Sequence, residues 1–324
     1  MLRAMPSLRP STRPSRAPRV VVVGDLMLDV VLAPGRALER GTDVPGRVML
    51  RQGGSAANTA RWLGRLGARA QLITAVGRDP VGRALVAAVR RDRVAVRATR
   101  VAGLPSGRIG VFVAAGGERS FVADRGAADA LAPGDIRAGW FASADGLHLP
   151  AYSLLGQPLG LAGRRASAQA HGAEAMVSVD LASSGPLLAA GRAAATALIS
   201  EVDPDLLFAT EAESSALLAG GPVEGLLDLA PIAIVKRGPK GASVLVRSET
   251  DGGPALRFDV ATKPIVAPDT TGAGDAFDAG FLVVWLGTAP ADRRRPTVLR
   301  RAVVAGHRAA ARQLGRPPEE LSFG

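Results

Sequence analysis

Hydrophobic runs alternate with amphipathic stretches along most of the chain. Four consecutive valines at 20–23 lead into Gly24 and have the character of a buried strand. Further strands are predicted at 70–77, 144–149, 174–181, 205–210 and 231–238. Small and apolar residues at helical spacing predict helices over 53–67, 79–94 and 297–314. This alternation predicts an α/β fold with a mostly parallel sheet and helices on both faces.

Two segments depart from this alternation. Residues 41–52 and 106–126 alternate apolar and polar positions, and the second contains a Gly-Gly pair typical of a hairpin turn. They predict antiparallel strands that project from the main sheet. Such strands could form a lid over a site, or they could be a surface hairpin with no role. We place the lid strands at approximately 33–52 and 106–126.

The amino-acid composition argues against several classes of protein. The chain has no cysteine, which excludes disulfides and thiolate metal sites and is compatible with a reducing cytoplasm, where we expect the protein to be. Its three histidines show no HExxH spacing, which argues against a zinc hydrolase. No apolar run reaches the roughly 20 residues needed to cross a bilayer, so we expect no membrane partner.

The formal net charge of +11 could suggest nucleic acid. Almost all of the positive charge is arginine, however, and five arginines lie within the first 19 residues, which contain no acid. No basic run is interleaved with aromatic residues, and we therefore expect no nucleic-acid partner. Residues 1–18 are predicted to be a disordered basic tail, although their composition also allows a transit peptide. Residues 19–324 are predicted to form the folded domain.

The segment DTTGAGDAF (269–277) carries the clearest chemistry. If a helix begins near Gly274, the peptides of Gly272, Ala273 and Gly274 form a bare cradle for an anion at its positive end. The helix dipole should keep Asp275 ionised. An anion cradle beside an ionised carboxylate suits phosphoryl transfer to a hydroxyl group, with the carboxylate as base. The alternative is an ordinary glycine-rich helix start with Asp275 as its cap.

This segment resembles the C-terminal signature of the ribokinase-like (PfkB) family of carbohydrate kinases. The N-terminal signature is also present, in Gly53, Gly54, Asn58, Gly67 and Gly77. The resemblance covers roughly residues 19–316. It implies a three-layer α/β/α sandwich with a mostly parallel central sheet and a small β-strand lid. A Walker A motif is absent, and GAGDAF lacks the third glycine of a dinucleotide fingerprint.

The resemblance assigns roles to individual residues. It implies that Asp275 is the catalytic base and that residues 272–274 form the anion hole. It implies that Asp29, Gly53, Gly54 and Asn58 bind the substrate. A carboxylate such as Asp29 can accept two hydroxyl hydrogen bonds, which suits a polyol. Asp29 could instead be a strand-end turn residue, and Asn58 could cap a turn.

A second set of residues is implied for ATP. The segment VKRGPKGASV resembles the nucleotide segment of the family, which places Lys236, Gly238 and Gly241 near ATP. His307 on the last helix corresponds to the adenine pocket of relatives. Lys236 could equally be a surface lysine at a strand end, and a lone helical histidine is commonly a surface residue.

The family's metal residues are matched in part. Glu213 stands where a glutamate organises Mg²⁺ through water, but Thr210 replaces the usual asparagine. In some relatives the stretch around Asp269 helps to bind a monovalent cation, which implies K⁺ as a further ion. Met27 stands where ribokinases have an asparagine, which makes ribose itself a doubtful substrate. The segment GDLMLD looks closer to the kinase half of bacterial heptose-phosphate enzymes.

The sequence therefore predicts a kinase that uses ATP and Mg²⁺ to phosphorylate a hydroxyl group, expected to be a primary hydroxymethyl, of a small sugar-like molecule. One alternative is a nucleoside kinase of the same fold, with Phe112 and Phe121 on the predicted lid available for stacking. Another is a non-catalytic ligand-binding relative. Relatives often dimerise through the lid strands, which gives a homodimer as an option here. The sequence identifies neither the sugar nor the oligomeric state.

Overall fold

The valine run forms strand β1 (Arg19–Val23) at the centre of the main sheet. Val20 and Val22 pack into one hydrophobic core, and Val21 and Val23 pack into a second core on the other side of the sheet. All four valines are fully buried, as expected for a parallel strand covered on both faces. The computed structural model describes residues 16–114, 119–250, 253–267 and 269–323. Most of the predicted tail and the Gly-Gly turn lie outside these residues.

The main sheet has nine strands in the order β13-β12-β11-β10-β9-β8-β1-β4-β5. Every neighbouring pair from β11 to β5 is parallel, whereas β12 and β13 add in antiparallel fashion at one edge. After β1, the strands are β4 (Arg69–Gly77), β5 (Ala95–Val101), β8 (Gly146–Pro150), β9 (Met176–Asp180), β10 (Leu206–Thr210), β11 (Ile232–Lys236), β12 (Ala242–Val246) and β13 (Leu256–Val260).

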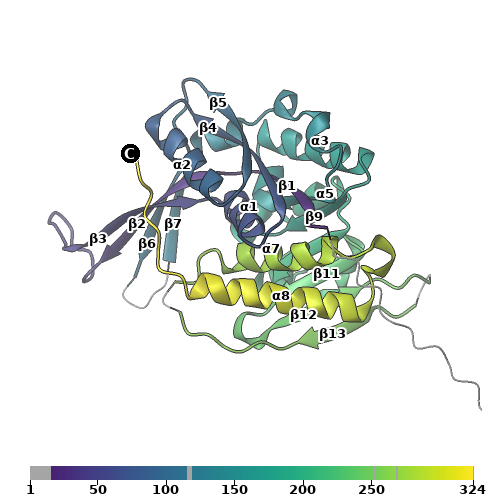
Figure 1. The fold of residues 1–324 in the computed structure, drawn as a ribbon. Coiled ribbons are helices and arrows are strands. Elements are labelled where there is room, and N and C mark those ends of the chain that lie inside the picture. The colour runs from purple at the N-terminus through teal and green to yellow at the C-terminus, as the bar shows by residue number, and fades with distance from the viewer. Residues whose placement is uncertain (1–15, 115–118, 251–252, 268, 324) are drawn as a thin grey trace, which may run out of the picture.

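Helices cover both faces of this sheet (Figure 1). One layer contains α1 (Ser55–Arg65), α2 (Pro80–Arg91), α7 (Ala273–Leu286) and α8 (Pro296–Leu314). The other contains α3 (Leu159–Gly172), α4 (Ser184–Leu188), α5 (Arg192–Ser200) and α6 (Glu211–Leu217). The predicted three-layer α/β/α fold is confirmed. Among the described residues, no helix has the length and apolarity that a membrane span requires.

A second, smaller sheet projects from the body of the molecule, at the left of Figure 1. Its strands run in the order β3-β2-β6-β7, where β2–β3 and β6–β7 are antiparallel and β2–β6 is parallel. They are β2 (Met27–Pro34), β3 (Gly46–Gly53), β6 (Arg108–Val113) and β7 (Arg119–Asp124). The first strand begins earlier than the predicted bound of 33. Asp29 therefore lies inside a strand of this small sheet and not in a turn at the end of β1.

The last residues of the chain pass beside the small sheet (Figure 1). Residues 315–320, after the end of α8, are exposed. Leu321 is buried, and its N–H donates to the carbonyl of Leu50 in β3 at 2.7 Å. Glu319 forms ion pairs with Arg61 and Arg65 of α1. We call residues 315–321 the C-terminal strap.

Candidate active site

Asp275 lies in the first turn of α7, which begins directly after Gly272. Gly272 has a φ of 75°, a left-handed conformation that glycine adopts without strain. The hydroxyl of Ser55 donates to Oδ1 of Asp275 at 2.7 Å, and the amide of Asn58 donates to Oδ2 at 2.9 Å. Because both donors come from the start of α1, the meeting of α1 and α7 fixes both carboxylate oxygens.

The electrostatics of Asp275 differ from expectation. Burial raises the pKa of Asp275 to about 6, and the hydrogen bonds from Ser55 and Asn58 only partly oppose that rise. The expected effect of the helix dipole is therefore outweighed by desolvation. The carboxylate is still mostly ionised at pH 7, with a pKa close to that of a working general base.

Lys236 lies beside the predicted anion cradle. A Cβ placed on Gly274 would approach its Nζ to 3.4 Å, so the bare backbone and the ammonium group are neighbours. The N–H of Ala273 donates to the carbonyl of Thr270 at 3.2 Å. One of the three expected donors therefore closes the turn, and Lys236 adds a positive charge that the glycine-rich motif alone did not predict.

Two further carboxylates surround Lys236, and sequence reasoning identified neither. Its Nζ lies 3.1 Å from Oδ2 of Asp180 and 3.1 Å from Oδ1 of Asp278. Burial lowers the pKa of Lys236, but Asp180 and Asp278 outweigh this effect and hold it above its usual value. The pKa of the fully buried Asp278 is raised by burial and by Asp180. We call Asp180, Lys236 and Asp278 the floor cluster.

The topology of the sheet and the spacing along α7 explain why the residues of the floor cluster meet. Asp180 and Lys236 end strands β9 and β11, and ligand sites in open α/β sheets lie at the carboxyl ends of the strands. Asp278 stands three residues after Asp275 in α7, so both side chains share one helix face. A carboxylate at the end of a predicted parallel strand is the signal that could have identified Asp180.

Asp29 is placed in a way that suits a substrate ligand. Its Oδ1 is buried and makes no hydrogen bond to any residue in the described part of the chain. Burial, reinforced by the charge of Asp25, raises the pKa of Asp29 to about 7, although Arg51 opposes the rise. Asp25 accepts a hydrogen bond from the N–H of Ala56 at 3.1 Å and was not singled out in the sequence.

The glycine pair has a steric explanation. A Cβ on Gly53 would lie 2.0 Å from Oδ1 of Asp29, so that carboxylate occupies the space of the missing side chain. Gly54 has a φ of 96°, and its Cβ would lie 2.7 Å from the carbonyl oxygen of Asp25. The pair therefore lets Asp29 and the start of α1 approach closely.

The Thr210–Glu213 pair forms a capping box at the start of α6. The N–H of Thr210 donates to Glu213 at 2.8 Å, and the N–H of Glu213 donates to the Thr210 hydroxyl at 3.2 Å. Burial, together with Asp180, raises the pKa of Glu213. Thr210 thus caps α6 through its hydroxyl. The role of Glu213 at Mg²⁺ stays a prediction, and no cluster of three metal-ligating side chains occurs among the described residues.

The remaining nucleotide residues lie elsewhere. Gly241 has a φ of 95° and its Cβ would lie 2.2 Å from the Val260 carbonyl oxygen, so glycine is required there by close backbone contact. Gly238 has a φ of 55°. The ring of His307 packs 5.3 Å from that of Phe277, and burial lowers the pKa of His307. Their assignment to ATP stays a prediction.

A cavity of about 350 Å³ opens between the small sheet, α1 and the C-terminal strap. Asp29, Asn58 and Gly272 line it, whereas Gly238, Gly241 and His307 are not part of the lining that the described residues form. Asp275 is not in that lining either, but the cavity adjoins the predicted base through Asn58, which donates to its Oδ2. Its volume is within the range of small-molecule sites.

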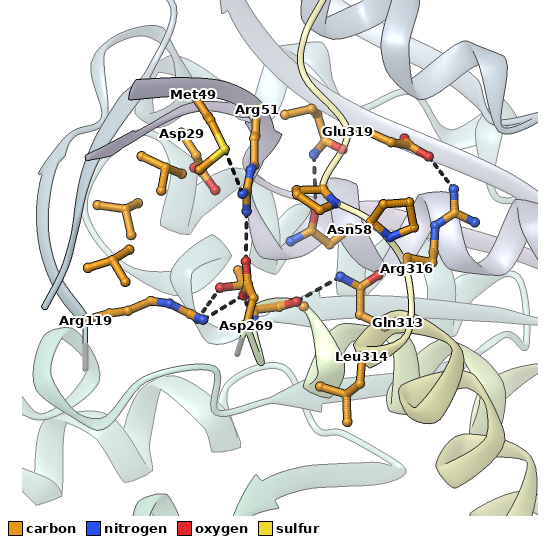
Figure 2. A pocket seen from close by; sticks show the side chains of 18 of the residues that line it. Asp29, Met49, Arg51, Asn58, Arg119, Asp269, Gln313, Leu314, Arg316 and Glu319 are labelled. Carbon is orange, nitrogen blue, oxygen red and sulfur yellow. Dashed lines mark hydrogen bonds and ion pairs between the residues drawn. The ribbon is translucent and has the colours of Figure 1, made fainter. Parts of the chain in front are cut away.

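Asp269 lies at the edge of this cavity, between two arginines of the small sheet (Figure 2). Its Oδ2 lies 2.8 Å from Nη1 of Arg51, and its Oδ1 lies 2.7 Å from Nη2 of Arg119. Its Oδ1 also accepts the N–H of Thr271 at 2.8 Å. The amide of Gln313 donates to the carbonyl of Thr271, which ties the loop to α8. Arginines already contact both carboxylate oxygens of Asp269 and compensate its charge. The binding of a monovalent cation at Asp269 stays a prediction.

Comparison with known proteins gives a consistent result. The model of the "pfkB family carbohydrate kinase" matches residues 17–317. A fructokinase of Klebsiella pneumoniae is 28% identical over 274 residues, which are 82% of this chain and 83% of that protein.

Two solved structures share the fold. The adenosine kinase of Sinorhizobium meliloti has a TM-score of 0.78 at 24% identity and covers 95% of this chain and 98% of its own. A double mutant of fructokinase from Vibrio cholerae O395, with fructose, ADP and potassium ion bound, has a TM-score of 0.75 at 22% identity and covers 94% of this chain and 95% of its own.

Proposed function

Since the chain belongs to the pfkB family of carbohydrate kinases and is a phosphotransferase with an alcohol acceptor, we propose that Asp275 is the base of the transfer from ATP to a hydroxymethyl group of a small sugar. The observation that carries this proposal is the position of Asp275. Ser55 and Asn58 fix its carboxylate, the sugar-sized cavity adjoins it through Asn58, and Lys236 lies beside the same helix start.

The proposed step balances as follows. A sugar hydroxyl, oriented by Asp29 and Asn58, directs its oxygen at the γ-phosphorus of ATP. The new P–O bond forms as the bond to the β-phosphate oxygen breaks, and ADP leaves with that electron pair. The hydroxyl proton moves to the carboxylate of Asp275. Lys236 and the backbone at 272–274 stabilise the negative charge on the phosphoryl oxygens.

Mg²⁺ would accompany ATP and neutralise charge on its phosphates. Oδ1 of Asp180 is buried without a hydrogen-bond partner in the described part of the chain, which fits a group that holds a water of the ion. We propose that Asp180 and Glu213 have this role. For K⁺, the V. cholerae fructokinase structure motivates a test at the 269–271 loop. Lys236, Gly238, Gly241 and His307 are proposed to line the ATP side.

The small sheet is proposed to close over the sugar as a lid, because its inner face forms one wall of the cavity. Closure would exclude water from the phosphoryl group. The other face of this sheet carries exposed Val48, Phe112 and Val122. That apolar surface supports a homodimer through the small sheets. A kinase that uses ATP is expected to work in the cytoplasm.

A nucleoside kinase is the second candidate. Phe121 lines the cavity with 61% of its surface exposed, and it could stack on a base. The S. meliloti adenosine kinase shows that this fold accommodates such an enzyme.

The test is a screen with Mg-ATP against pentoses, hexoses, sugar phosphates, sugar acids and nucleosides, following ADP release. Asp275→Asn should lower kcat by at least about 10³-fold on any accepted substrate, because it removes the proton acceptor. The exposed Asp228→Asn is the matched control and should keep full activity. If nothing is turned over while a ligand raises the Tm of wild type and Asp275→Asn equally, the protein is a binding module and the proposal is wrong.

A further inference from the structure

One face of the small sheet forms a wall of the cavity, and arginine dominates its polar positions. Because side chains alternate along a strand, one set faces inward. The strand register brings its members together in three rows across the sheet. The cavity-lining members are Asp29, Val31 and Ala33 of β2; Arg47, Met49 and Arg51 of β3; Val111 and Val113 of β6; and Arg119 and Phe121 of β7.

The arginines of this wall outnumber its carboxylates. Arg51 and Arg119 share the single carboxylate of Asp269, so two positive charges face one negative charge (Figure 2). Arg47, at the exposed end of β3, has no ion pair among the described residues. Asp29 is the other acid of this wall. With Arg47 included, three arginines therefore stand against two carboxylates at this wall, an excess of one positive charge.

Arg51 has unused hydrogen-bonding capacity. A guanidinium group has five N–H donors. In Arg51, Nη1 donates to Asp269 at 2.8 Å, but Nη2 has only the thioether of Met49 at 3.3 Å, a weak acceptor. Its Nε is buried and has no partner in the described part of the chain. Nη2 and Nε of Arg51 therefore lack a strong hydrogen-bond acceptor, which an anionic ligand would supply.

The arginines of the facing wall are different. Arg61 contacts Asp92, Gln52 and Glu319, and Arg65 contacts Asp92 and Glu319. Arg316 also pairs with Glu319, so three arginines share two acids in a network that joins α1 to the C-terminal strap. None of these three arginines has a buried nitrogen without a partner in the described part of the chain, in contrast to the Nε of Arg51.

We propose that the sugar substrate carries an anionic group, either a phosphate or a carboxylate, which Arg51 and Arg119 bind while Asp29 and Asn58 hold its hydroxyl groups. This inference rests on the proposed sugar-kinase function. Planar guanidinium groups bind phosphate and carboxylate oxygens through paired N–H donors, and binding in a cavity strengthens the attraction. A neutral sugar would leave the Nε of Arg51 without a charged acceptor.

A role only in holding the small sheet to Asp269 explains less. One arginine would satisfy that carboxylate, since its Oδ1 also accepts the N–H of Thr271. Arg119 also donates to the hydroxyl of Thr271, which ties β7 to the same loop. The buried Nε of Arg51 would still lack an acceptor, which an anionic substrate supplies.

The experiment compares pairs of substrates that share a carbon skeleton and differ in the anionic group. Fructose is paired with fructose 6-phosphate and with fructose 1-phosphate, and the open-chain glucitol is paired with gluconate, each assayed with Mg-ATP. We expect kcat/KM to be at least about 100-fold higher for an anionic member than for its neutral partner, as expected for a charged hydrogen-bonded pair. The phosphate and carboxylate pairs show which anion the site takes.

Variants test the assignment to the wall. Arg119→Gln should reduce the anionic-to-neutral ratio of kcat/KM by at least about tenfold, mainly through KM of the anionic sugar. The control is Arg108→Gln in the same sheet, where Arg108 pairs with Asp124 on the opposite, exposed face. It makes the same change of charge and should leave the ratio unchanged.

The outcomes distinguish a failure of the anion proposal from a failure of the proposed kinase function. If neutral sugars are phosphorylated as well as their anionic partners, or if Arg108→Gln lowers the ratio as much as Arg119→Gln, the anion proposal is wrong and the kinase function stands. If no sugar of either class gives turnover that depends on Asp275, the proposed function fails and the anion proposal fails with it.

Discussion

The floor cluster and the arginine wall of the small sheet balance their charges in opposite ways. In the floor cluster, one buried lysine lies between two carboxylates, and Asp278 is fully buried. In the wall, two arginines share one carboxylate, and the side chain of Asp269 is 41% exposed. Buried paired charges hold one geometry, because separating them costs several kcal/mol. Partly exposed charges in excess remain available to a ligand. The floor cluster is therefore expected to hold one geometry, whereas the arginines of the wall can change partners when a ligand binds.

The largest effect is expected when the floor cluster loses its cation. Lys236→Met would leave Asp180 and Asp278 without a counter-charge, and the free energy of unfolding should fall by about 3–5 kcal/mol. Denaturant unfolding measures this loss, and Lys236→Met combined with Asp278→Asn should recover part of it. The control Lys240→Met removes a lysine with 71% of its side chain exposed and should change stability little. Equal stability of Lys236→Met and wild type would contradict the buried-pair description.

The next effect concerns the contact between the small sheet and α1. Gly53→Ala would place a Cβ 2.0 Å from Asp29 Oδ1 and displace that carboxylate. We expect kcat/KM to fall about 10²-fold, as small misplacements of binding groups do, with little loss of stability. Gly172→Ala, at a position where a Cβ meets nothing within 4 Å, is the matched control. Unchanged kcat/KM in Gly53→Ala would contradict the proposed role of Asp29 in substrate binding.

A smaller effect is expected in the pH dependence. The protonated form of Asp275 cannot accept the substrate proton, so kcat should fall as the pH drops through the pKa of about 6. Ser55→Ala removes a hydrogen bond that favours the charged form, which raises this pKa and moves the acid limb upward by about one pH unit. The pH profile of kcat measures the shift. Ser200→Ala, at an exposed position, should leave the profile unchanged. A downward shift in Ser55→Ala would contradict the assigned base.

The smallest effect is expected from salt. Raising NaCl from about 0.05 to 0.5 M shortens the screening length to a few ångströms. Attraction at the partly exposed wall should weaken, and KM should rise about two- to fivefold. The buried floor cluster is screened much less, so kcat should change less than about twofold. A sucrose series of equal osmolality is the control. A fall in kcat with constant KM would contradict this description, because the buried floor cluster would then be more sensitive to salt than the wall.

Local patterns predicted much of this molecule. The valine run, the strand–helix alternation and the two glycine-rich signatures predicted the parallel sheet and the three-layer fold, because periodicity and turn residues act over short distances. The antiparallel strands β12 and β13 and the edge strand β5 were not predicted. The small sheet was foreseen in outline, but β2 was placed several residues late, since its apolar run continues from the valines.

The site was predicted less completely. Asp275 and Asn58 meet as hydrogen-bonded partners, but Ser55, Asp180 and Asp278 were missed, because these contacts join residues far apart in the chain. The upward shift of the pKa of Asp275 was not predicted either, since it depends on burial by several elements, whereas the helix dipole can be inferred from one. Roles assigned through the family resemblance stay predictions for each residue.

The C-terminal strap has a consequence for how this enzyme can evolve. Pro317 and Pro318 line the cavity, yet they are exposed and belong to no helix or strand. Substitutions there can reshape the cavity without disturbing the hydrophobic cores or Asp275. If the cavity holds the substrate as proposed, new substrate preferences are accessible to natural selection through single mutations that cost the fold little, while Asp275 and the floor cluster remain unchanged.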